Sequence, residues 1–171
     1  ALITLPVALA GWVFLPDTPA IGALLLLGAA LHLARLARWR GLSTTAEPLL
    51  LVLHIGYAWV VFGVALLGLS VLGAAIPPSA AIHALTAGAI GTMTLAVMTR
   101  ATRGHAGRPL TADRPTILIF TLIPLAATTR IAAALSTTWA TPLLIAAASL
   151  WIAAFACFVI AYAPMLLLRR R

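Results

Sequence analysis

The side chains in this sequence with the clearest potential for chemistry are those of its four histidines, because imidazole nitrogen is a good ligand for iron and copper. His54 and His83 lie in long apolar stretches, His32 lies near the end of another, and His105 lies in a basic segment. A polar side chain is costly in an apolar helix, so it usually joins helices together or serves a function. Both alternatives stay open for His54 and His83: a metal or cofactor ligand, or a histidine that packs helices.

The surroundings of His54 suit a flat ligand. Small residues such as Ala58 share its helical face, and Tyr57 lies beside it, where a phenol could orient a ligand group. His32 is predicted at a similar depth, so a site made by His32 and His54 is geometrically possible. We favour the simpler interpretation that His32 reaches the membrane interface.

Small residues follow His83 at spacings that allow another helix to approach closely (Ala84, Ala87, Gly88 and Gly91). His54 and His83 are expected near opposite sides of the membrane. By helix rise alone, the two imidazoles should lie more than about 10 Å apart. We therefore predict that they do not ligate one iron together.

A basic segment, TRGHAGRPL, follows the helix of His83 and carries Arg103, His105 and Arg108. Arginine recognises carboxylates through paired hydrogen bonds, so this segment could clamp an anion. We favour the simpler interpretation that it anchors the chain to anionic lipid. Arg130, inside an apolar stretch, is expected to reach the interface or to hold an anion near His83.

Several classes of function lack the residues they need. The only acids are Asp17, Glu47 and Asp113, all predicted in loops, which leaves no paired carboxylates for hydrolysis and no intramembrane carboxylate for ion coupling. The single cysteine, Cys157, excludes an internal disulfide and a CxxC metal site. The soft ligands that copper prefers show no convergent spacing (Cys157, Met93, Met98 and Met165).

Composition places these residues in a membrane protein. The chain has 171 residues, of which 63% are hydrophobic and 8% charged, whereas soluble domains carry about 25% charged residues. The net charge of +8 is confined to the ends of apolar runs, at 35–40, 100–114 and 169–171, apart from Arg130. Such clustering is typical of a membrane protein and gives no basic face for nucleic acid.

Six apolar runs predict an all-α bundle of membrane helices in one domain, at about 1–15, 20–37, 49–72, 80–99, 116–135 and 142–168. Arginine-bearing connections alternate with connections that lack arginine. The bias predicts that the basic loops and both termini are cytoplasmic. Because the first run is short and begins at Ala1, we expect the chain to be a fragment of a longer one.

Three stretches carry a family resemblance: HALTAGAIGTMTLAVMTRATRGHAGRPL at 83–110, LARLARWRG with EPLLLVLHIGYAW at 33–59, and AYAPMLLL at 161–168. They resemble the NnrS family, bacterial inner-membrane proteins described as haem- and copper-containing and tied to the nitric oxide response. The resemblance covers about residues 30–171 and falls on the C-terminal half of the family's longer chain.

The resemblance implies haem and copper cofactors, with His54 and His83 as metal ligands and Tyr57 beside them. It also implies that Arg103, His105 and Arg108 hold haem propionates. Nitric oxide binding, electron transfer and protection of metal centres all remain open as activities. A second copy or a preceding half of the chain could complete the site. The alternatives are a cofactor-free transporter or channel-like bundle, and a purely structural membrane subunit.

Overall fold

The computed structural model describes residues 2–167, with the backbone alone for Leu42. These residues form the α-helices α1 (Thr4–Phe14), α2 (Pro19–Arg38), α3 (Pro48–Val71), α4 (Pro78–His83), α5 (Gly91–His105), α6 (Arg114–Leu135) and α7 (Ala140–Leu167). A 3-10 turn, η1 (Gly41–Thr44), precedes α3, and a π-helical segment, η2 (Ala84–Ile90), joins α4 to α5. The described residues contain no strand, so the predicted all-α class is confirmed.

Within residues 2–167, five helical segments are long and apolar enough to cross a membrane: α2, α3, the continuous rod from α4 through α5, α6 and α7. The first helix, α1, has 11 residues and is shorter than a span. Proline occupies the first turn of α2, α3, α4 and α6, where its missing N–H costs nothing. These prolines explain why the helices restart where they do.

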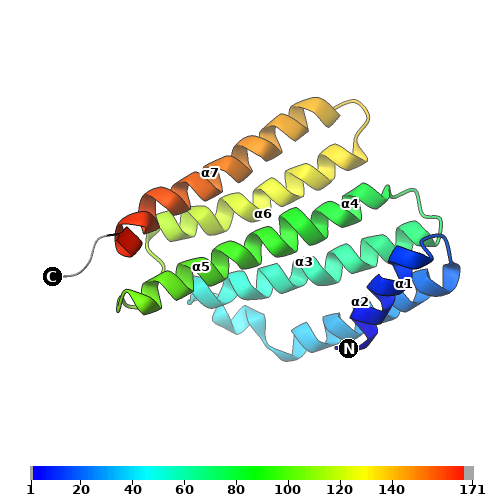
Figure 1. Cartoon of the computed structure of the whole chain (residues 1–171), viewed down its shortest axis with the longest axis horizontal. Coiled ribbons are helices and arrows are strands. Elements are labelled where there is room, and N and C mark those ends of the chain that lie inside the picture. Colours follow the sequence, from blue (N-terminus) through cyan, green and yellow to red (C-terminus); the bar gives the residue numbers. More distant parts are fainter. Residues whose placement is uncertain (1, 168–171) are drawn as a thin grey trace.

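The helices stand in sequence order beside one another (Figure 1). Each spanning helix packs against the next, and α3 lies between α2 and the α4–α5 rod. Apolar side chains from α3, α5, α6 and α7 form one core cluster, and side chains from α1 to α4 form another. α3 contributes to both clusters and therefore ties the two sides of the bundle together.

Glycines set the close packing of α3 against the α4–α5 rod. A Cβ on Gly63 would lie 2.7 Å from Leu85, and a Cβ on Gly88 would lie 2.7 Å from the Trp59 ring. Both distances are too short for any larger residue without a shift. The close approach expected from the small residues after His83 is therefore present at Gly88.

The π-helical segment η2 begins directly after His83, within a run predicted as one regular helix. Such segments are rare and occur often at functional sites. Just beyond it, Thr92 has the one buried side-chain oxygen or nitrogen in the described residues that lacks a hydrogen-bond partner. Hydrophobic patterning carries no signal for a single extra residue per turn, so this irregularity could not be predicted.

One helix boundary differs from its prediction. The fourth helical rod continues to His105 rather than ending near residue 99, so Arg100, Arg103 and His105 are helical. The predicted basic loop is shorter and includes Gly107, which has φ +61°. Residue 1 and residues 168–171, which include the C-terminal arginines, lie outside the described residues.

Candidate functional site

A cluster of histidine and aromatic side chains lies between α2 and α3, next to η1. His32 is 5% exposed, and its Nδ1 shares a 2.5 Å hydrogen bond with the hydroxyl of Tyr57. The ring of Trp39, just after α2, lies 4.7 Å from the Tyr57 ring between centroids. His32 is thus buried and hydrogen-bonded, so the favoured interpretation that it reaches the membrane interface is wrong.

Trp39 connects this pair to His54 and to the basic end of α2. The His54 ring meets Trp39 edge-on, with 6.2 Å between centroids. On α2, the Arg35 guanidinium lies 5.1 Å above the Trp39 ring, in a cation–π arrangement. The four rings come from two helices and the residue that follows one of them, so only folding assembles them.

The tautomer of His54 follows from its hydrogen bond. Its Nδ1 lies 3.0 Å from the backbone carbonyl of Leu50. A carbonyl can only accept, so Nδ1 carries the proton and donates it. In the neutral ring, Nε2 then keeps a free lone pair, as in histidines that bind metals.

A groove of about 600 Å³ opens beside His54. Its lining is mostly apolar and includes Leu51, Ile55 and Ala58, with Arg40 and Ser43 as polar members. Gly41 packs directly on the His54 ring, because a Cβ on Gly41 would lie 2.7 Å from Cδ2 of His54. Arg40 holds a left-handed backbone with φ +50°, which is uncommon for a residue with a side chain.

These residues fit a haem better than a copper ion. A single imidazole with a free Nε2, an apolar wall and an arginine able to hold a carboxylate match the chemistry of a porphyrin with propionates. In the described part of the chain, no three side chains of His, Cys, Asp or Glu come together. The geometry therefore assigns no copper site.

His83 lies far from this cluster. It ends α4, is half-buried, and lies within electrostatic range of Arg130 on α6. Leu85, two residues later, packs on Gly63, which is nine residues beyond His54 along α3. At about 1.5 Å per residue, the two histidines are separated by roughly 15 Å along the bundle. The structure does not bring them together.

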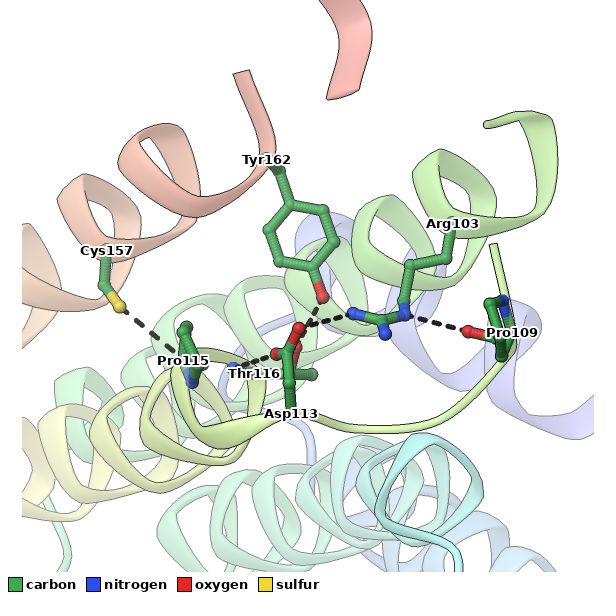
Figure 2. Close-up of polar contacts among 7 residues, drawn as sticks. All are labelled: Arg103, Pro109, Asp113, Pro115, Thr116, Cys157 and Tyr162. Atoms are coloured by element: carbon green, nitrogen blue, oxygen red, sulfur yellow. Dashed lines mark hydrogen bonds and ion pairs between the residues drawn. The ribbon is translucent and has the colours of Figure 1, made fainter. Parts of the chain in front are cut away.

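A polar network, which the sequence analysis did not predict, joins α5, α6 and α7 at the arginine-bearing end of the bundle (Figure 2). The buried Arg103 donates to Asp113 at 2.8 Å and to the Pro109 carbonyl at 3.1 Å. Thr116 donates its hydroxyl proton to Asp113 at 2.5 Å. Tyr162 lies 2.5 Å from the same hydroxyl, and it must donate because Thr116 has only one proton.

Asp113 is the acceptor at the centre of this network. Partial burial acts to raise the pKa of its carboxyl, but hydrogen bonds from Thr116 and Arg103 outweigh burial, so the pKa lies below its usual value. Its side chain also caps α6 through the Thr116 backbone N–H. An Asp followed within two residues by Pro, just before an apolar run, is a helix-start signal that could have located this cap.

The other predicted residues lie apart. His105 and Arg108 are exposed near the end of α5. Met93 packs against Gly56, Met98 is 38% exposed, and the Cys157 thiol lies 3.9 Å from the Pro115 carbonyl. Met165 packs on the core cluster that includes α7. No soft-ligand site forms from these residues.

Fold and site together define a multi-pass helical membrane protein with a buried histidine–aromatic cluster at its arginine-bearing end. The family model described as NnrS protein matches residues 1–170, so the chain belongs to the NnrS family. The match reaches further toward the N-terminus than the predicted 30–171. At the level of the family, this is a bacterial membrane protein related to the nitric oxide response. No curated protein and no solved structure matches the chain significantly.

Proposed function

We propose that this protein binds haem in the groove beside His54 and acts in the nitric oxide response of the bacterial inner membrane. The observation that carries the proposal is the Nδ1–H bond from His54 to Leu50, which leaves Nε2 as a ligand beside an apolar groove. The family's association with nitric oxide supports the same conclusion.

Each residue of the site has a separate role in this proposal. His54 would hold the haem iron through its Nε2, and the Leu50 carbonyl fixes the ring orientation. Apolar side chains on α2 and α3 keep water from the groove. Arg40 holds a propionate by paired hydrogen bonds. Bound haem iron would supply the affinity for nitric oxide.

The other residue roles that the resemblance implies are also proposals. His83 is proposed as a second metal ligand, whereas the copper that the resemblance implies is assigned to no particular residue. Arg103, His105 and Arg108 were predicted to hold propionates. Of these, Arg103 already donates to Asp113 and Pro109, so His105 and Arg108 have more hydrogen-bonding capacity to offer. A second copy of the chain is the proposed source of any further ligand.

The visible spectrum of protein purified from haem-replete membranes tests the proposal. Wild type should show a Soret band that His54→Gln loses, while His83→Gln keeps it. Ala58→Phe, which fills the groove and leaves His54 in place, should also reduce the band. A wild-type protein without a Soret band would instead favour the cofactor-free transporter or channel-like bundle.

A further inference from the structure

A second groove, separate from the His54 groove, lies on the other side of α3. It has a volume of about 560 Å³ and runs between α3 and the C-terminal end of α5, where these helices lie side by side (Figure 1). Leu53, Val97, Ala101 and Leu110 form its apolar lining. Arg100 and His105 also line it, so the groove combines an apolar lining with two basic side chains.

No side chain among residues 2–167 forms an ion pair with Arg100. Among the described residues, the one ion pair joins Arg103 to Asp113. Asp17 lies in the connection from α1 to α2, and Glu47 is exposed before α3. Arg100 is half-buried and falls within the apolar rod that ends at His105. A cation at that place in a membrane is costly without a counter-ion, so an anion from outside the protein is expected.

Space for an acyl chain is open at Gly104. A Cβ built on Gly104 meets no other atom within 4 Å, although Gly104 lies in a helix and lines the groove. Seven other glycines would bring a Cβ within 3.0 Å of a neighbouring atom (Gly11, Gly22, Gly41, Gly56, Gly63, Gly68 and Gly88). The surface at Gly104 is therefore hollow rather than packed.

We propose that this groove binds an anionic phospholipid, with the phosphate on Arg100 and His105 and an acyl chain along the apolar lining. The guanidinium pairs with phosphate in two parallel hydrogen bonds. The chain carries a net charge of +8, which attracts anionic lipid over neutral lipid. The site takes lipid rather than free phosphate because the apolar lining and the open space at Gly104 are part of it.

Native mass spectrometry of the full chain in neutral detergent tests this proposal, with phosphatidylglycerol and phosphatidylcholine added at equal concentrations. Wild type should retain one phosphatidylglycerol in preference to phosphatidylcholine. Arg100→Gln should weaken that binding about tenfold, as expected for the loss of a charge-assisted hydrogen bond. Gly104→Leu should weaken it as well, because the new side chain fills the groove while every charge stays. Leucine is also a better helix former than glycine, which protects folding.

Arg114→Gln is the matched control, since it removes one exposed arginine at the same end of the bundle outside the groove. It should retain the lipid as wild type does. Equal loss in Arg114→Gln and Arg100→Gln would show attraction by overall charge and overturn the proposal. Unchanged binding in Gly104→Leu would overturn it too, as would displacement of the lipid by inorganic phosphate.

Discussion

At the scale of single residues, hydrogen-bond geometry distinguishes the four histidines. His32 shares its Nδ1 with Tyr57, and His54 donates its Nδ1 proton to Leu50. His83 lies near Arg130, and His105 is exposed. Only His54 combines a fixed tautomer with an adjoining groove. The spacing of histidines in the sequence carries none of this information, because a tautomer depends on the partner of each nitrogen.

The His32–Tyr57 hydrogen bond gives a prediction at this scale. Tyr57→Phe removes one hydrogen bond to a histidine that is 5% exposed, so the protein should lose about 1 kcal/mol of stability. Thermal unfolding in detergent measures the loss. The double variant with His32→Phe should cost less than the sum of the two single changes. Strict additivity would show that the bond contributes nothing.

At the scale of elements, one carboxylate and a few glycines determine how the helices meet. Asp113 caps α6 and pairs with Arg103 of α5, while Tyr162 of α7 joins through Thr116. Gly63 and Gly88 allow α3 to approach the α4–α5 rod. These contacts hold the spanning helices in register, which apolar packing alone does weakly in lipid.

Two substitutions at Asp113 separate its charge from its cap. Asp113→Asn keeps an oxygen that can cap α6 but loses the ion pair with the buried Arg103. Asp113→Ala loses both and should be less stable than Asp113→Asn by about 1 kcal/mol. Thermal unfolding of the two variants gives the comparison. Equal stability of the two variants would mean that the cap contributes nothing to the free energy of unfolding.

The same residue gives a pH dependence. The folded-state pKa of Asp113 is lowered, so its stabilisation is present above the ordinary aspartate value of 3.8 and is lost as pH falls through the folded-state pKa. Wild-type unfolding temperature should therefore drop more steeply than that of Asp113→Asn when the pH is lowered below about 4. Parallel curves for the two proteins would contradict the assignment.

The close approach at Gly88 predicts a strong effect of a small change. Gly88→Ala places a Cβ 2.7 Å from the Trp59 ring and should cost about 1–3 kcal/mol. Gly28→Ala is the control, because its Cβ would meet nothing within 4 Å. That variant should be neutral or more stable, since alanine favours helix. Equal unfolding temperatures for the two variants would argue against the packing of α3 on η2.

At the scale of the whole molecule, the described arginines gather at one end of the bundle, with Arg130 as the exception. This end also carries the His32–Tyr57 pair, the Asp113 network and both grooves. The positive-inside bias predicts that this end faces the cytoplasm. The proposed haem and lipid sites then both open near the cytoplasmic face.

Cysteine labelling tests that orientation. In a Cys157→Ser background, Ala74→Cys in the connection after α3 should react with an impermeant thiol reagent in intact spheroplasts. Ala46→Cys, in the connection before α3, should react only after permeabilisation. Both positions are exposed, so accessibility depends on the side of the membrane. The opposite labelling pattern would show that the predicted orientation of the bundle in the membrane is wrong.

The sequence by itself determined the class of fold and the family. Runs of about 20 apolar residues can satisfy their backbone only as membrane helices, and the breaks at Pro19, Pro48, Pro78 and Pro115 place the boundaries closely. The predicted helix end near residue 99 was wrong, because Arg100 and Arg103 suggested a loop although α5 continues to His105. Helix propensity is compatible with arginine, and Asp113 neutralises the buried Arg103.

Tertiary structure alone decided which polar groups meet. Residues 32 and 57 pair across two helices, and residues 103, 113, 116 and 162 form one network. Hydrophobic periodicity shows which face of a helix is apolar, but not how a neighbour is rotated or shifted against it. Those choices depend on side-chain shape, as at Gly63 and Gly88, and they emerge only when the helices pack.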